Sequence, residues 1–346
     1  MEEEVSPETA RLKAELLTGG SVRLPDDFRL PFPKSRSTAG PGAGQSEVVF
    51  AFGGTRAKKP VTRDEGEFDL VQAGQGLEIR REGRTIIAHV KILPTLLHAP
   101  SQAFVNIDDT CILGCVFCNV PRLLNHVTKH LDDEKIVSMI LKASETDGFQ
   151  SVALTSGVPV EPGMTVARMA GLVRRIRAAL PDTPIGVEPY ATRPDHVDSL
   201  YEAGATEIKL NIESFDRDIF EKVCPCRDYD HILHVINHAG EVFGRNRVCS
   251  NIIFGLGETD ENVVHGVKVL ANMGAVATLR ALRLSEMNSD PLREVLGTLR
   301  PVTPDRMVRL ALAHKDVLMD HGLTTRSFGT MCHSCLACDL VPFWDV

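Results

Sequence analysis

The sequence predicts an α/β protein whose main part is a partial (β/α)6 TIM-type barrel. From about residue 103 onward, short apolar runs alternate with longer segments of helical periodicity. Alternation of strand and helix in one direction gives a parallel sheet with right-handed crossovers, and the chemistry of such a barrel is expected at the carboxyl ends of its strands. The six candidate strands are 104–107, 152–155, 185–189, 207–212, 248–254 and 278–282.

Amphipathic helices are expected between these strands. One follows Asp132 as its N-cap, another spans about residues 166–180, and a third follows Thr303, has Pro304 in its first turn and ends near Gly322. Helical spacing defines one apolar face on each of them. The residues expected on these faces are Ile136, Met139, Ile140 and Ala143; Val166, Met169, Val173, Ile176 and Leu180; and Met307, Leu310, Ala311, His314, Val317 and Leu318.

Residues 1–100 differ in composition and are expected to form a small accessory region of mixed structure. Segments 78–81 and 85–92, around Glu82-Gly83, predict a β-hairpin. The glycine-rich run 35–44 offers backbone N–H groups to an anion, but it does not lie between a clear strand and a helix, so an ordinary loop is favoured. The expected organisation is therefore 1–100, a barrel at 101–322 and a C-terminal segment at 323–346.

Charge and hydropathy narrow the class of function. The net charge is −8 and no Lys/Arg run is longer than Lys58-Lys59, which argues against nucleic acid as a partner. The chain starts with acidic residues, and no apolar run approaches the roughly 20 residues that span a bilayer. We therefore expect no membrane association and a cytoplasmic location.

Three cysteines, Cys111, Cys115 and Cys118, follow the first candidate strand with spacings of three residues and then two. Thiolates are the natural ligands of a [4Fe–4S] cluster, and three of them leave one iron open. Gly114 allows the loop a backbone angle that a side chain would resist. Structural zinc sites usually combine two ligand pairs, and no second pair lies nearby, so a cluster is favoured over zinc.

A second triplet, Cys332, Cys335 and Cys338, lies near the end of the chain with two-residue gaps. This spacing favours a second [4Fe–4S] cluster, while zinc with His333 as a fourth ligand remains an alternative. Six of the nine cysteines fall into these two triplets, a usage typical of a reducing compartment. For the remaining three, Cys224, Cys226 and Cys249, a passive role is favoured over contact with substrate.

Several segments in order resemble the radical S-adenosylmethionine (SAM) superfamily over about residues 100–346. The cysteine loop comes first, and the later segments are Thr155-Ser156-Gly157, Glu188, the run Asn211-Ile212-Glu213-Ser214 with Tyr229 after it, and 251–259, which contains Gly-Leu-Gly-Glu-Thr. The closest resemblance is to lipoyl synthase, with biotin synthase next. Ordinary lipoyl synthases carry their auxiliary cysteines before the radical loop. Cysteines at the C-terminus resemble instead the two-protein lipoyl synthase of archaea and some bacteria.

The resemblance implies roles for individual residues. Cys111, Cys115 and Cys118 would be the catalytic ligands of the radical [4Fe–4S] cluster, whose open iron binds S-adenosylmethionine. A second, auxiliary [4Fe–4S] cluster would use Cys332, Cys335 and Cys338, with Ser327 of the Arg326-Ser327 pair as a further ligand. The residues expected to bind the cofactor are Phe117, against adenine, Ser156, Gly157, Glu188, Asn211, Glu213 and Ile253.

The implied reaction is sulfur insertion into an unactivated C–H bond. An electron from a ferredoxin- or flavodoxin-type donor cleaves S-adenosylmethionine, the 5′-deoxyadenosyl radical removes hydrogen, and the carbon radical takes sulfide from the second cluster. The implied substrate is octanoyl-lysine on a lipoyl carrier protein or other octanoylated domain, with a companion radical SAM protein as partner. Two alternatives stay open: a radical enzyme of another pathway whose second cluster relays electrons or anchors substrate, and a zinc-binding scaffold.

Overall fold

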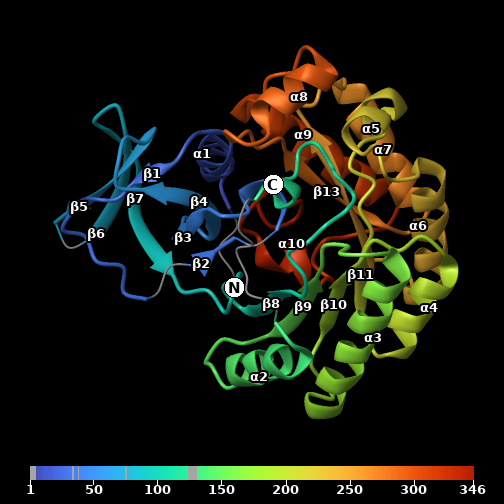
Figure 1. The fold of residues 1–346 in the computed structure, drawn as a ribbon. Helices are drawn as coiled ribbons and strands as arrows, with labels where there is room; N and C mark the ends of the chain where they lie inside the picture. The colour runs from blue at the N-terminus through green and yellow to red at the C-terminus, as the bar shows by residue number, and fades with distance from the viewer. Residues whose placement is uncertain (1–4, 33–34, 38, 75, 124–130) are drawn as a thin grey trace.

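The computed structural model describes residues 5–32, 35–37, 39–74, 76–123 and 131–346. Two sheets dominate these residues, one of seven strands from the N-terminal part and one of six parallel strands from the rest (Figure 1). In Figure 1 the strands of the first sheet run from blue to teal, those of the second run from green to orange, and the red C-terminal segment lies between the two sheets.

The six parallel strands pair in chain order and confirm the predicted partial barrel. The fourth strand is shorter than expected: it ends at Lys209, and Glu213, which has a left-handed backbone conformation (φ +69°), pairs with Ile252 of the next strand only through an isolated bridge. The observed strands are β8 (Gln102–Asn106), β9 (Ser151–Thr155), β10 (Ile185–Glu188), β11 (Glu207–Lys209), β12 (Val248–Phe254) and β13 (Val276–Ala281).

Helices pack on the outside of this sheet, and the three predicted ones are present. Asp132 caps the first by accepting a hydrogen bond from the Lys135 N–H (2.7 Å), and Thr303 caps the third in the same way. On the first helix Val137 is buried where Met139 was expected, and Leu180 is the C-cap of the second. The observed helices are α2 (Asp133–Ser144), α3 (Pro162–Ala179), α4 (Pro194–Glu202), α5 (Arg217–Val223), α6 (Tyr229–Phe243), α7 (Asp260–Asn272), α8 (Ser289–Leu296), α9 (Pro304–Asp320) and the short α10 (Met331–Cys335), with a 3₁₀ turn η2 (Val120–Arg122) after the first cysteine loop.

The N-terminal part combines helix α1 with a small closed barrel of strands. Pairing of its third and last strands closes the ladder into a ring around an apolar core that includes Phe50, Phe68 and Ile79. The predicted hairpin is present, with Arg81 opposite Arg84. The elements are α1 (Pro7–Thr18), β1 (Val22–Arg23), β2 (Ser35–Arg36), η1 (Gly40–Gly42), β3 (Ser46–Phe52), β4 (Thr55–Thr62), β5 (Phe68–Ala73), β6 (Gly76–Arg81) and β7 (Arg84–Leu93).

The C-terminal segment joins the two sheets. The backbone N–H of Lys58 in β4 donates to the carbonyl of Ala337 (2.6 Å), and the buried ammonium of Lys13 in α1 lies 2.7 Å from the Asp345 carboxylate. On its other side, the segment packs closely on β10, where a Cβ at Gly186 would lie 2.2 Å from the Thr330 hydroxyl oxygen. None of the described helices has the length and apolar character needed to cross a membrane.

Candidate active site

The first cysteine loop follows β8 at the carboxyl end of the parallel sheet. Backbone hydrogen bonds fix it on two sides: the Ile112 N–H donates to the Val158 carbonyl (2.9 Å), and the Val116 N–H donates to the Val223 carbonyl (2.8 Å). Gly114 has a φ of +64°, which confirms the expected left-handed position. The loop is therefore held by its backbone independently of its cysteine side chains.

Gly157 and Ser156 support this loop from the end of β9. The Gly157 N–H donates to the carbonyl of Asp108 (2.8 Å), and a Cβ at position 157 would lie only 2.3 Å from the carbonyl oxygen of Thr110. The Ser156 hydroxyl donates to the carbonyl of Gly157 (2.7 Å). Gly157 is required for the close approach of the cysteine loop. Cofactor binding by Ser156 and Gly157 stays a prediction.

Glu188 lies at the end of β10 and is held by two donors. Its Oε1 accepts a hydrogen bond from the Asn211 side-chain amide (2.8 Å) and lies 3.2 Å from the Lys209 ammonium. Burial favours the neutral acid, but the charge of Lys209 and the amide hydrogen bond outweigh it, so the pKa of Glu188 lies below its ordinary value. Glu188 is thus a half-buried, ionised carboxylate, and its contact with ribose hydroxyls stays a prediction.

Glu213 follows β11 and faces Arg227, a residue that no motif of the sequence indicates. Arg227 Nη1 lies 3.3 Å from Glu213 Oε1, and Nη2 of the same guanidinium donates to the carbonyl of Asn211. Burial raises the pKa of Glu213 above its ordinary value although Arg227 opposes the shift. Arg227 follows Cys-Pro-Cys and belongs to no recognisable motif, so its contact with Glu213 is visible only in the folded structure.

Cys224 lies beside the first cysteine triplet. Its thiol is buried, hydrogen-bonds with Cys115, and lies 3.9 Å from Arg227 Nη1. The hydrogen bond with Cys224 lowers the pKa of the Cys115 thiol to about 7, and the charge of Arg227 acts in the same direction against burial. Since the thiolate is the form that binds metal, these neighbours prepare Cys115 for ligation. Cys226, in contrast, is exposed.

Three buried polar atoms in this region have no hydrogen-bond partner among the residues that the structure describes: Glu213 Oε2, Arg227 Nε and Asn251 Oδ1. Buried polar atoms are normally paired, so these atoms, which come from β12 and from the segments that follow β11 and precede α6, fit a polar ligand such as S-adenosylmethionine. Among the described residues, no three His, Cys, Asp or Glu side chains converge as the ligands of a single metal ion do. A [4Fe–4S] cluster binds its thiolates through separate irons.

Two further residues named from the sequence lie in the same region. Phe117 is buried, and its carbonyl accepts a hydrogen bond from the Asn288 side chain (2.9 Å). Ile253 in β12 is buried, and its N–H donates to the Glu213 carbonyl (2.7 Å). Contact of either side chain with a cofactor stays a prediction.

The second cysteine triplet contacts the inner residues of the parallel sheet. Cys332 Sγ lies 3.2 Å from the Lys209 ammonium and 2.7 Å from Arg280 Nη2, at the end of β13. The Arg280 guanidinium also pairs with Asp339 (3.1 Å). Burial raises the pKa of the Cys335 thiol to about 12, and the neighbouring cysteines act in the same direction. Two cationic side chains, Lys209 and Arg280, thus lie against the Cys332 sulfur.

The other proposed ligands of the second site make separate contacts. The Ser327 hydroxyl donates to the Thr324 carbonyl (3.4 Å), and the Ser327 carbonyl accepts from Arg247 (3.0 Å). His333 is buried, with Nε2 3.3 Å from the Thr278 hydroxyl and its ring against Phe328. Ligation by Ser327 therefore stays a prediction, and so does the zinc alternative with His333.

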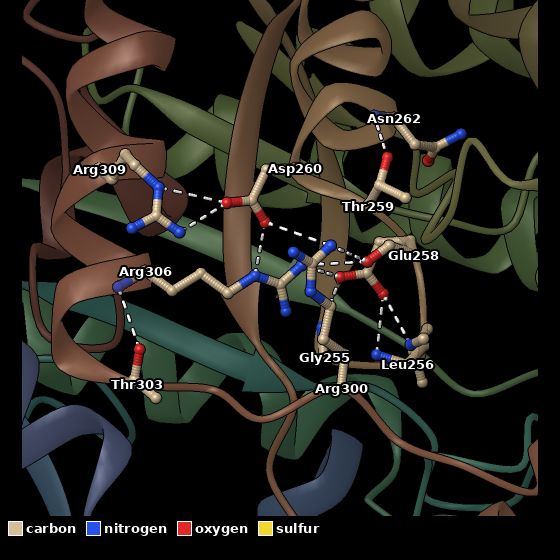
Figure 2. A network of polar contacts seen from close by, with 11 residues as sticks. Gly255, Leu256, Glu258, Thr259, Asp260, Asn262, Arg300, Thr303, Arg306 and Arg309 are labelled. Atoms are coloured by element: carbon tan, nitrogen blue, oxygen red, sulfur yellow. Dashed lines mark hydrogen bonds and ion pairs between the residues drawn. The ribbon is translucent and has the colours of Figure 1, made fainter.

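The Gly-Leu-Gly-Glu-Thr segment is at the centre of a network of polar contacts (Figure 2). The Glu258 carboxylate accepts hydrogen bonds from the backbone N–H groups of Gly255 (2.7 Å) and Leu256 (2.8 Å), and it pairs with Arg306 of α9 (2.6 Å). Arg306 also contacts Asp260 at the start of α7 (2.7 Å). These contacts engage the Glu258 carboxylate with groups of the protein itself. They connect the loop after β12 to α7 and α9.

The comparisons with known proteins agree with this geometry. The radical SAM superfamily model matches residues 105–270, which span the first cysteine loop and β8 to α7 except its last residues. Biotin synthase from Geobacter sulfurreducens is 29% identical over 54% of this chain and 54% of its own length. Lipoyl synthase from Frankia casuarinae is 28% identical over 48% and 49%. The chain thus spans about half the length of the curated relatives it matches.

Solved structures show the same fold at lower identity. Methylornithine synthase superposes with a TM-score of 0.50 and 19% identity, covering 64% of this chain and 69% of that one. The hydrogenase maturase HydG from Carboxydothermus hydrogenoformans gives 0.53 and 18%, covering 64% and 52%. A radical SAM domain implies a [4Fe–4S] cluster and S-adenosylmethionine as cofactors. With its cysteine loop, its partial barrel and these relatives, the chain carries a radical SAM domain over residues 105–270, and the relatives of that domain include biotin and lipoyl synthases.

Proposed function

We propose that the protein inserts sulfur into an unactivated C–H bond, and that it acts as a lipoyl synthase on octanoyl-lysine of a lipoyl carrier protein or octanoylated domain. Its partners would be a ferredoxin- or flavodoxin-type electron donor and a companion radical SAM protein. The curated relatives support sulfur insertion in general, since both biotin and lipoyl synthases are among them. Choice of the lipoyl substrate rests on the second triplet at the C-terminus.

One observation carries the proposal: buried contacts join the second cysteine triplet to the cofactor side of the same barrel. Cys332 contacts Lys209, and Lys209 contacts Glu188. Glu188 accepts a hydrogen bond from Asn211, and the Asn211 carbonyl accepts one from Arg227. Arg227 in turn contacts Cys224, which lies beside the first triplet. A sulfur source must lie close to the carbon from which hydrogen is removed, because proximity and orientation supply a large part of the rate.

The chain's own residues would bind and orient the reactants. Cys111, Cys115 and Cys118 would hold the radical cluster, and Cys332, Cys335 and Cys338 the second cluster. When bound, the first cluster with S-adenosylmethionine supplies a radical that removes hydrogen from carbon, and the second cluster supplies sulfur. Glu188 and Asn211 would orient the cofactor, while the buried walls of the barrel exclude water.

The test replaces all three cysteines of the second triplet by alanine. The first triplet has its own backbone supports on the loop after β8, so 5′-deoxyadenosine formation should continue in this variant. Thiolated product should disappear. One anaerobic reaction with an octanoylated carrier peptide, run with and without the companion protein, gives both measurements by mass spectrometry.

The controls separate the competing functions. If the wild type forms deoxyadenosine but no thiolated peptide under any of these conditions, the lipoyl assignment is wrong and only the radical assignment remains. Biotin formation in a parallel assay would assign the protein as a biotin synthase instead of a lipoyl synthase. Cys226→Ala is the matched control, since this cysteine is exposed and should leave both products unchanged.

A further inference from the structure

Lys209 occupies a position between the two proposed sites. It comes from β11, its side chain is 2% exposed, and its ammonium lies 3.2 Å from Glu188 Oε1. The same ammonium lies 3.2 Å from Cys332 Sγ. A single buried cation thus contacts the carboxylate assigned to the cofactor and a thiol assigned to the second cluster.

The neighbouring contacts show why Lys209 matters more than the other cation on Cys332. Arg280 also contacts Cys332, but its second partner is Asp339 in the C-terminal segment. On the far side of Lys209, Glu188 accepts a hydrogen bond from Asn211. Lys209 therefore contacts both Cys332 and Glu188 directly, whereas the charge of Arg280 acts on Glu188 from a longer distance and its ion pair is with Asp339.

We propose that Lys209 is a positioning residue that couples the two sites, so that the state of Cys332 sets the affinity for S-adenosylmethionine. A free Cys332 sulfur shares the ammonium with Glu188 and weakens the hold on that carboxylate. If Cys332 held a cluster, its sulfur would be engaged as a ligand and would compete less for the ammonium, which would then hold Glu188 more firmly in place for the ribose hydroxyls. Charge interactions are strong at such short range in a buried setting.

This coupling would order the reaction. The cofactor would bind tightly only after the second cluster is in place, so that cleavage of S-adenosylmethionine without a sulfur source is disfavoured. By thermodynamic reciprocity, bound S-adenosylmethionine would in turn stabilise the loaded second site. The inference rests on the proposed function, because that function assigns Glu188 to the cofactor and Cys332 to a cluster.

The test compares two variants that both lack the second cluster. Cys335→Ala with Cys338→Ala leaves the Cys332 sulfur beside Lys209, while the triple alanine variant also removes it. Affinity for S-adenosylmethionine is measured by equilibrium dialysis on anaerobic protein that carries the radical cluster. The triple variant should bind about fivefold more tightly or better, the lower range of typical coupling between sites. Equal affinities overturn the proposal without any change at Lys209.

Variants of Lys209 then assign the effect to this side chain. Lys209→Met should abolish the difference between the double and triple variants, and Lys209→Arg, which keeps the cation, should preserve much of it. A difference that persists unchanged in Lys209→Met would overturn the proposal. Lys209→Gln serves if the Met variant does not fold, and iron content with circular dichroism monitors folding in each protein.

Two controls distinguish a failure of the proposed coupling from a failure of the proposed function. Lys58→Met removes another buried lysine near the C-terminal segment, one whose ammonium pairs with Glu47 (3.3 Å), and it should leave the difference intact. Glu188→Ala should weaken binding of S-adenosylmethionine in the wild-type background. If it does not, the assignment of Glu188 to the cofactor fails, which is a failure of the proposed function and is recognisable as such.

Discussion

Gly157 is the residue on which the position of the first cysteine loop depends most directly. A Cβ there would lie 2.3 Å from the Thr110 oxygen, closer than atoms can approach without movement. Gly157→Ala should displace the loop, destabilise the protein by about 1–3 kcal/mol and lower the iron bound by the first triplet. Iron analysis and urea unfolding measure both effects.

Gly171 in α3 provides the matched control for this substitution. A Cβ at Gly171 would meet no atom within 4 Å, and the residue lies inside a helix. Gly171→Ala should therefore keep the iron content and leave stability equal or up to about 1 kcal/mol higher, because alanine is the better helix former. Normal iron content in Gly157→Ala would show that the loop adapts and that the close approach is not required.

The sequence was sufficient to predict the site residues that belong to motifs. It was insufficient to predict the buried residues that contact them. Cys111, Gly114 and Gly157 belong to segments whose spacing or backbone needs are visible in the sequence. Lys209 and Arg227 are single charged residues, and their partners are brought to them only when the strands pair. The role of Glu258 was also hidden, since its three backbone donors exist only once the loop after β12 has folded.

The predicted elements of the parallel barrel were found because their sequence patterns are strong. Its strands are buried on both faces and read as continuous apolar runs, and its helices have clear caps at Asp132 and Thr303. The accessory barrel was missed beyond its hairpin. One of its strands, β1, is only two residues long and pairs in parallel with β4 and β5, a contact with no local signal.

Helix α1 is tied to distant parts of the chain by two ion pairs of different burial. Lys13 and Asp345 are 0% and 1% exposed, and the Thr55 hydroxyl also donates to Asp345. Asp345→Asn leaves the Lys13 ammonium buried without its counter-ion and should lower the free energy of unfolding by about 3–5 kcal/mol. Urea unfolding followed by circular dichroism gives this value.

The control for that variant uses the same helix. Arg11 pairs with Asp305 at the start of α9, where both side chains are largely exposed. Asp305→Asn should leave the unfolding midpoint close to that of the wild type, because exposed pairs contribute little. Equal effects of the two substitutions would contradict the view that the C-terminal segment is anchored through the buried pair.

At the scale of the whole molecule, the two sheets enclose the second cysteine triplet from opposite sides. The accessory barrel supplies Lys58, whose backbone donates to Ala337, and the parallel barrel supplies Lys209 and Arg280 to Cys332. A segment that contacts both parts in this way is positioned by the complete fold. This arrangement gives the accessory barrel a role in holding the second site, which composition alone did not indicate.

The iron content of the whole protein tests this arrangement together with the identity of both centres. Two [4Fe–4S] clusters predict about eight irons per chain after anaerobic reconstitution, and either triple alanine variant should retain about four. Zinc in place of iron at the C-terminal triplet would leave about four irons and one zinc in the wild type, and the alanine variant of that triplet would then lose only zinc. Elemental analysis with electron paramagnetic resonance of the reduced protein separates these results. Since the two triplets lie on different segments, loss of all iron in the C-terminal variant would contradict independent centres and show that the first loop needs the second site to form.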